Sequence, residues 1–163
     1  DLDDLLLQDG SPRELWQLTS QEKLLRREVA RSIQQMAKTA YMVNQEAVTG
    51  EEKETDIRLR SSASTQEGVI ELKVAENGYS VNDLREALET QLLHKYLAPE
   101  HRRVGCLLIS ISSDRYWLHP DDKHKMNIIE LVEFLNAQAR ELVNSMNGDV
   151  FLFVKALDLR PRL

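Results

Sequence analysis

The clearest pattern along the chain is a pair of short stretches in which apolar and polar residues alternate, on either side of a polar loop. Alternation with a period of two is typical of strands that have one buried face. The apolar positions are Ile57 and Leu59 in the first stretch and Ile70, Leu72 and Val74 in the second. We therefore predict a β-hairpin over residues 55–74 that turns near residues 63 and 64.

Three longer segments show the spacing of amphipathic helices. The first begins at about residue 20 and ends near Tyr41, because Thr19-Ser20-Gln21-Glu22 has the pattern of a capping box. The second runs from Ser80 or Asn82 to about Ala98, before Pro99. The third is predicted to begin at Asp121 and Asp122 and to end at Gly148.

Three further apolar stretches predict strands at residues 42–48, 104–111 and 150–154, the second of them central and covered on both faces. The order of elements is then helix, three strands, helix, strand, helix, strand. This order indicates an α/β fold with a mixed sheet and helices on both faces. Residues 1–19 are predicted to be a linker or short helix from an upstream region, and residues 20–163 a single domain. Because the first residue is Asp, we expect the chain to be part of a longer protein.

Composition narrows the function classes. The formal net charge of −6 is unusual for a stand-alone nucleic-acid-binding protein, which generally carries a basic excess. No apolar run is long enough to span a membrane. The single cysteine, Cys106, lies in an apolar run and is predicted to be a buried, reduced core thiol. One cysteine excludes an internal disulfide and fits a cytoplasmic location.

The predicted hairpin brings acidic and basic side chains together. A turn near residues 63 and 64 places Asp56 opposite Glu71, with both side chains on the polar face. Lys73, two residues further on, joins that face. Two carboxylates and an ammonium so placed are suited to a metal and phosphate site. The structural alternative is a solvated strand face with ordinary salt bridges.

The second predicted helix carries polar residues in its apolar stripe. Gln91 and Lys95 continue the stripe formed by Leu84 and Leu88. Such residues either border a cavity or find polar partners. One interpretation is a long side chain that reaches the edge of the core. The other is that this helix face looks toward the same pocket as Glu71.

Asp56 followed by Glu71-Leu72-Lys73, within the order helix-strand-strand-strand-helix-strand, resembles the PD-(D/E)xK nuclease superfamily over residues 20–111. The resemblance implies a restriction-endonuclease-like αβββαβ core, to which the C-terminal helix and strand are added. It assigns Asp56, Glu71 and Leu72 to a divalent cation, Mg²⁺ or Mn²⁺, and Lys73 to the attacking water. Some members also have a glutamate on the first helix, which Glu28 matches.

Other members carry a glutamine on the helix that follows the E-x-K strand, and Gln91 occupies that place. The stretch from Gln91 to Tyr96 is similar to the Q-x-x-x-Y motif of RecB-like nucleases, but with one extra residue before the tyrosine. The chain also lacks the proline that often precedes the aspartate, since Thr55 stands before Asp56.

The resemblance implies a metal-dependent nuclease that acts on DNA as the effector domain of a larger protein, such as an antiphage defence or restriction system. Hard oxygen ligands suit Mg²⁺, which lowers the pKa of bound water and binds phosphate oxygens. Lys95, Arg58 and Arg60 are candidate phosphate contacts. Upstream domains of the same polypeptide and further copies of the chain are candidate partners. The alternatives are a catalytically inert docking or dimerisation module with the same fold, and an RNase.

The histidines suggest a second cluster. His119, Asp121 and His124 have spacing that allows a metal site, but Pro120 and the predicted helix start among them favour a helix cap. His94 and His101 are predicted to face phosphate or solvent.

Overall fold

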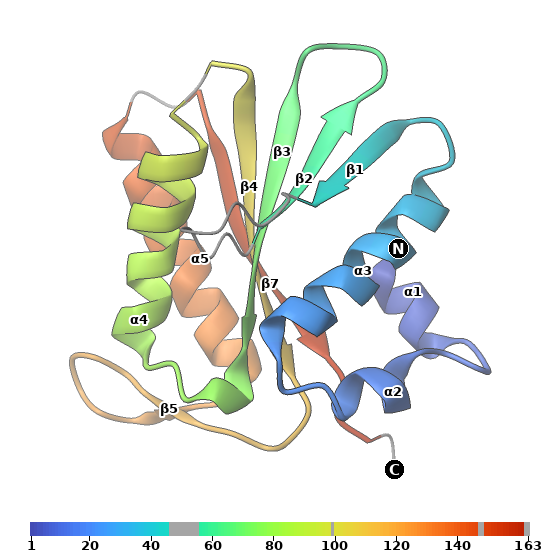
Figure 1. Ribbon diagram of the computed structural model, residues 1–163. Helices are drawn as coiled ribbons and strands as arrows, with labels where there is room; N and C mark the ends of the chain where they lie inside the picture. The colour runs from blue at the N-terminus through green and yellow to red at the C-terminus, as the bar shows by residue number, and fades with distance from the viewer. Residues whose placement is uncertain (46–55, 99, 147–148, 162–163) are drawn as a thin grey trace.

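The central sheet is mixed and has five strands. The computed structural model describes residues 1–45, 56–98, 100–146 and 149–161, with the side chains of Gln45 and Asp56 outside this description. In spatial order the strands are β1 (Tyr41–Gln45), β2 (Asp56–Ser61), β3 (Glu67–Val74), β4 (Arg102–Ile111) and β7 (Phe151–Asp158). β1, β2 and β3 are antiparallel neighbours, whereas β4 is parallel to both β3 and β7 (Figure 1). The predicted α/β class with a mixed sheet is confirmed.

Helices cover both faces of this sheet (Figure 1). On one face lie α1 (Leu2–Leu7), α2 (Arg13–Gln17) and α3 (Glu22–Ala37). On the other lie α4 (Val81–Glu86), its π-helical continuation η2 (Ala87–Tyr96) and α5 (Ile128–Ser145). A 3₁₀ turn, η1 (Ala75–Asn77), connects β3 to α4. Two hydrophobic clusters therefore form, one on each side of the sheet.

The register of the β2–β3 hairpin is the predicted one. Asp56 pairs with Glu71, and Ile57 pairs with Ile70. Leu72 is buried in the cluster beneath α3, whereas Val69 is buried in the cluster beneath α4 and η2. Because side chains alternate along a strand, Glu71 and Lys73 point to the same side as Val69, toward α4 and η2.

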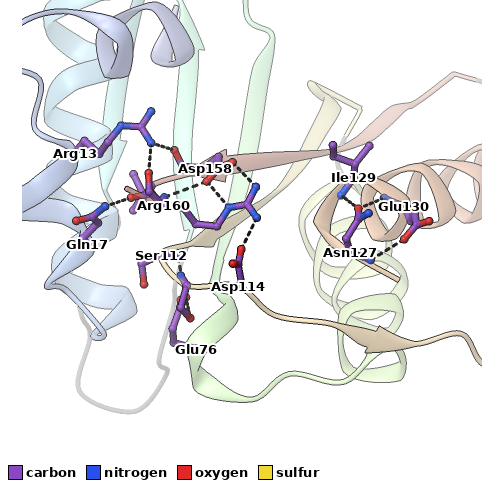
Figure 2. A network of polar contacts seen from close by, with 12 residues as sticks. Arg13, Gln17, Glu76, Ser112, Asp114, Asn127, Ile129, Glu130, Asp158 and Arg160 are labelled. Carbon is purple, nitrogen blue, oxygen red and sulfur yellow. Dashed lines mark hydrogen bonds and ion pairs between the residues drawn. The ribbon is translucent and has the colours of Figure 1, made fainter. Parts of the chain in front are cut away.

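Residues 1–18 form two short helices that pack on the sheet. Leu6 and Trp16 are buried in the same cluster as α3. The Arg13 guanidinium donates to the main-chain oxygens of Asp158 (2.6 Å) and Arg160 (2.9 Å), and the Gln17 amide donates to that of Leu159 (Figure 2). These bonds attach α2 to the end of β7. The two helices therefore pack on the same sheet as α3.

The start of α3 differs from the prediction. The helix begins at Glu22 with Gln21 as N-cap, and no side chain caps it, so the predicted capping box is absent. The Glu22 carboxylate instead accepts a hydrogen bond from the main-chain N–H of Val74 at 3.1 Å. Glu22 therefore contacts the end of β3 and does not cap its own helix. The helix ends at Ala37, before Lys38, which has a positive φ (53°), and not near Tyr41, where β1 begins.

The predicted second helix occurs, as α4 and η2, and Ser80 caps it. Its second half was not expected to be π-helical. Pro99 and Gly148, which were predicted to mark helix ends, lie outside the described residues, as do residues 46–48 of the predicted first strand. The last strand extends to Asp158, beyond the predicted residue 154.

The prediction of a helix entry at Asp121 and Asp122 is wrong. These residues lie in the turn of a two-stranded hairpin made of β5 (Trp117–Leu118) and β6 (Lys125–Met126). The α5 helix begins only at Ile128. Asn127 caps it by accepting hydrogen bonds from the main-chain N–H groups of Ile129 (2.8 Å) and Glu130 (3.1 Å), as Figure 2 shows. The capping box is complete there, so it takes precedence over the two aspartates.

Candidate functional site

A buried ion pair lies at the centre of the predicted site. The Lys73 ammonium is 2.9 Å from Oε1 of Glu71, and the two side chains are 8% and 1% exposed. Both residues come from the polar face of β3, which α4 and η2 partly cover. Taking two charges out of water costs several kcal/mol per ion before their attraction is counted. A salt bridge on a solvated strand face would not incur this cost. Because Glu71 and Lys73 are almost fully buried, they do not form an ordinary surface pair.

The backbone brings Asp56 next to this pair. Asp56 and Glu71 are direct partners in the antiparallel β2–β3 ladder. Side chains opposite each other in such a ladder have Cβ atoms about 4.5–5.5 Å apart. The Asp56 side chain itself lies outside the described part of the chain. The Leu72 side chain is fully buried on the opposite face. Leu72 could therefore bind a cation only through its main-chain carbonyl oxygen.

Two residues that the sequence did not single out support Lys73. The Lys73 ammonium lies 5.3 Å from the centre of the Tyr79 ring, within the range of a cation–π contact. Tyr79 donates a hydrogen bond to Glu22, and burial together with this carboxylate raises the pKa of the Tyr79 hydroxyl. Glu22 also accepts from the side-chain amide of Asn77 (3.3 Å). Glu22 therefore holds Tyr79 at the end of β3, with the tyrosine ring beside Lys73.

The sequence contained a signal for Glu22 that pointed elsewhere. Its position three residues after Thr19 matched a capping box, which is a local pattern. The actual partners, Val74 and Tyr79, are more than fifty residues away in sequence. No periodicity argument connects residues at that separation.

Gln91 is half-buried on η2, which packs against β3 and β4 on the same side of the sheet as Glu71. Its Oε1 atom is buried and has no hydrogen-bond partner among the described residues. A buried polar atom left unsatisfied costs about 1–3 kcal/mol. Such an atom commonly marks a place that water or a ligand fills.

The π-helix changes the relation between Gln91 and Tyr96. In a π-helix the hydrogen bonds join residues five apart rather than four. Residues five apart are therefore close neighbours on adjacent turns. Gln91 and Tyr96 are therefore neighbours on adjacent turns despite the extra residue between them. Tyr96 is buried, with 4% of its surface exposed.

Other predicted residues are placed less centrally. Glu28 is half-buried on α3, where its carboxylate lies 3.4 Å from the Arg31 guanidinium, and α3 packs on the face of the sheet opposite to Glu71. The α3 glutamate that contacts the surroundings of Lys73 is Glu22. Lys95 is exposed, with its ammonium 5.1 Å from the Tyr96 ring centre. The prediction that Lys95 belongs to the buried stripe is therefore wrong.

The two β2 arginines share a strand face with Asp56 by the alternation of the strand. Arg58 pairs in the ladder with Val69, and Arg60 pairs with Glu67. Arg58 is half-buried and Arg60 is exposed.

The remaining histidines divide into two groups. His94 is exposed, whereas His101 lies 3.6 Å from the Glu67 carboxylate, which also accepts from Arg102 at 2.9 Å. His119 and His124 lie with Asp122, and not with Asp121, at the tip of the β5–β6 hairpin. The prediction that they cap a helix is wrong, because α5 begins at residue 128.

Comparisons of the chain with models of protein families, with curated proteins and with solved structures found no match in any of the three sets. Of the helices that the structure describes, none has the length and apolar character needed to cross a membrane.

Proposed function

We propose that the chain is a metal-dependent nuclease domain with a restriction-endonuclease-like αβββαβ core, and that its substrate is DNA. The observation that carries this proposal is the almost completely buried ion pair of Glu71 and Lys73. Glu71 is the residue that pairs with Asp56 in the β2–β3 ladder. An ion pair without a function gains little from such burial, since apolar residues of similar volume often stabilise a protein as well or better.

The residues present fit a divalent cation with oxygen ligands. Asp56 and Glu71 offer carboxylates, and Leu72 offers a main-chain carbonyl between Glu71 and Lys73. Mg²⁺ and Mn²⁺ favour carboxylate, carbonyl and water oxygens. The buried Oε1 of Gln91, which lacks a partner among the described residues, is a further oxygen on the same side of the sheet. When bound, the cation supplies a water of lowered pKa and positive charge beside the phosphate.

The side chains of this chain then have separate roles. Glu71 and the Tyr79 ring hold the Lys73 ammonium in place. There Lys73 orients the attacking water and meets the negative charge that develops on the phosphoryl oxygens. Gln91 positions the substrate or Lys73. Arg58, Arg60 and Lys95 are phosphate contacts, which would make binding weaken as the salt concentration rises.

The domain acts as an effector within a larger protein, and an antiphage or restriction system is a fitting context by family analogy alone. The acidic net charge of −6 supports this view, because an isolated domain of this charge would attract DNA poorly. Other domains would bring it to its substrate.

The test is cleavage of plasmid DNA and of RNA by the protein, in its full-length form, with Mg²⁺, with Mn²⁺ and with EDTA. Asp56→Ala and Lys73→Met should each abolish metal-dependent cutting. Glu89→Gln, an exposed carboxylate on η2, is the matched control and should cut as the unmodified protein does. Absence of metal-dependent cutting of either nucleic acid would favour the inert docking module, and cutting of RNA alone would favour the RNase.

A further inference from the structure

A second group of candidate ligands lies at the tip of the β5–β6 hairpin. Trp117 pairs with Met126 and Leu118 with Lys125, and residues 119–124 form the tip. One ligand atom from each of His119, Asp122 and His124 lies within 4.8 Å of the other two. Nδ1 of His124 is 2.6 Å from Oδ1 of Asp122, and Nδ1 of His119 is 3.2 Å from the same oxygen.

Hydrogen bonds within the tip hold the three side chains close together. The main-chain N–H of Asp121 donates to Nδ1 of His119 at 3.3 Å. The Asp122 oxygen that faces it is also an acceptor, and the main-chain N–H of His124 donates to it at 3.2 Å. Oδ1 of Asp122 thus lies close to the Nδ1 atoms of both histidines.

The backbone holds this arrangement. The N–H of His119 donates to the carbonyl of His124 (2.9 Å), and the N–H of Lys123 donates to the carbonyl of His119 (3.1 Å). Lys123 has a left-handed conformation (φ 61°), which is uncommon for a residue other than glycine. The two imidazole rings are stacked with centres 4.9 Å apart, and His119 and Phe134 of α5 pack edge to face. The ligands are thus placed by the fold.

We propose that His119, Asp122 and His124 bind a transition-metal cation of the Zn²⁺ class, with water completing the coordination. Two imidazoles and one carboxylate suit Zn²⁺, with bonds of about 2.0–2.2 Å, whereas Mg²⁺ prefers oxygen ligands alone. Ligand atoms around a tetrahedral Zn²⁺ lie roughly 3.3 Å apart for such bonds. The present separations, from 2.6 Å to within 4.8 Å, need only small rotations of exposed side chains to reach this value.

Binding at the tip would reach further than the hairpin. His119 contacts α5 through Phe134, so a bound ion would fasten the tip to that helix. The indole N–H of Trp117, on β5, donates to the main-chain carbonyl of Tyr79 at 3.0 Å. A cation at the tip would therefore stiffen the strand that holds Tyr79. The binding site itself stands independently of the proposed nuclease function.

The test is isothermal titration of the protein with Zn²⁺ in a buffer that contains millimolar Mg²⁺, so that oxygen-only sites are occupied. We expect one Zn²⁺ per chain. His124→Ala and Asp122→Asn should each weaken binding by at least about tenfold, because even residues that only support a ligand contribute that much. Asp121→Asn and a double His94→Ala/His101→Ala variant are the controls, and both should bind as the unmodified protein does.

The side chains of Asp122 and His124 are 66% and 51% exposed, so their replacement should leave the fold intact. Thermal unfolding without metal checks this, and added Zn²⁺ should raise the melting temperature of the unmodified protein but not of His124→Ala. No binding by the unmodified protein, equal binding by all variants, or loss of binding only in the His94/His101 variant would each overturn the proposal.

Discussion

Replacing Lys73 by methionine tests whether the ion pair is as deeply buried as the structure indicates. Methionine keeps most of the aliphatic length but removes the ammonium that lies 2.9 Å from Glu71. At an effective dielectric constant of about 20, two charges at this separation attract by roughly 6 kcal/mol, which desolvation largely offsets. Removing one partner leaves the desolvation of the other uncompensated, so the variant should lose about 3–5 kcal/mol of unfolding free energy.

Equilibrium unfolding in urea measures this loss. Trp16 and Trp117 are 2% and 4% exposed, so tryptophan fluorescence reports on both sides of the sheet. With a denaturant slope of about 2 kcal/mol/M, the midpoint should fall by roughly 2 M. Lys125→Met removes an exposed ammonium on β6 and should change the unfolding free energy by less than about 0.5 kcal/mol.

The double variant Glu71→Gln/Lys73→Met separates burial from other causes. Without either charge, no unpaired ion remains, so most of the lost stability should return. A loss below about 1 kcal/mol in Lys73→Met would mean that solvent screens the pair. A double variant no more stable than Lys73→Met would mean that the lysine acts through packing alone. Either result would refute the argument from burial.

Three further predictions follow from single sites. Burial raises the pKa of the Cys106 thiol to about 12, so thiol reagents at pH 8 should label the native protein no faster than it unfolds; rapid labelling would contradict its burial. A Cβ at Gly105 would lie 2.9 Å from Cδ1 of Leu97, so Gly105→Ala should cost about 1–3 kcal/mol in urea unfolding, and a neutral result would show that Leu97 moves freely. Burial tends to raise the pKa of Glu76, but hydrogen bonds from Ser112 and Ser113 lower it overall; its stabilising contribution is therefore complete above its unfolded pKa of about 4.3 and is lost as the pH falls through the lower folded value. Glu76→Gln should accordingly be less stable than the unmodified protein at pH 7, and the difference should shrink as the pH falls below about 4.3. A difference that does not change with pH would contradict this assignment.

The β2–β3 hairpin was predictable because its sequence leaves one register. A shift by a single residue would move Ile57, Leu59 and the facing apolar residues to the polar side. The midpoint of the loop then determines which residues are opposite, and Asp56 pairs with Glu71 as expected. A different pattern predicted β4: an uninterrupted apolar run of that length suits a strand covered on both faces.

Competition between local signals explains the errors at the third helix. Asp121 and Asp122 were plausible caps, but Asn127 with Glu130 forms a complete capping box five residues later. The residues between them pair with Trp117 and Leu118, and short strands of two residues have too few positions to show alternation. The cluster of His119, Asp122 and His124 depends on that turn, so its membership could not be derived from spacing alone.

The π-helical segment resolves the anomaly that α-helical spacing created. On an α-helix, Gln91 and Lys95 would continue the stripe of Leu84 and Leu88, but η2 buries Leu92, Leu93 and Tyr96 and leaves Lys95 exposed.

π-Helical turns are rare and are found frequently at functional sites. In this protein the π-helical segment buries the Gln91 Oε1 atom, which has no hydrogen-bond partner among the described residues. A rare backbone form and an unsatisfied polar atom are both costs, and sequence-based reasoning tends to fail where function imposes such costs. That both occur on the element that packs over β3 supports the proposal that Gln91 faces a ligand site shared with Lys73.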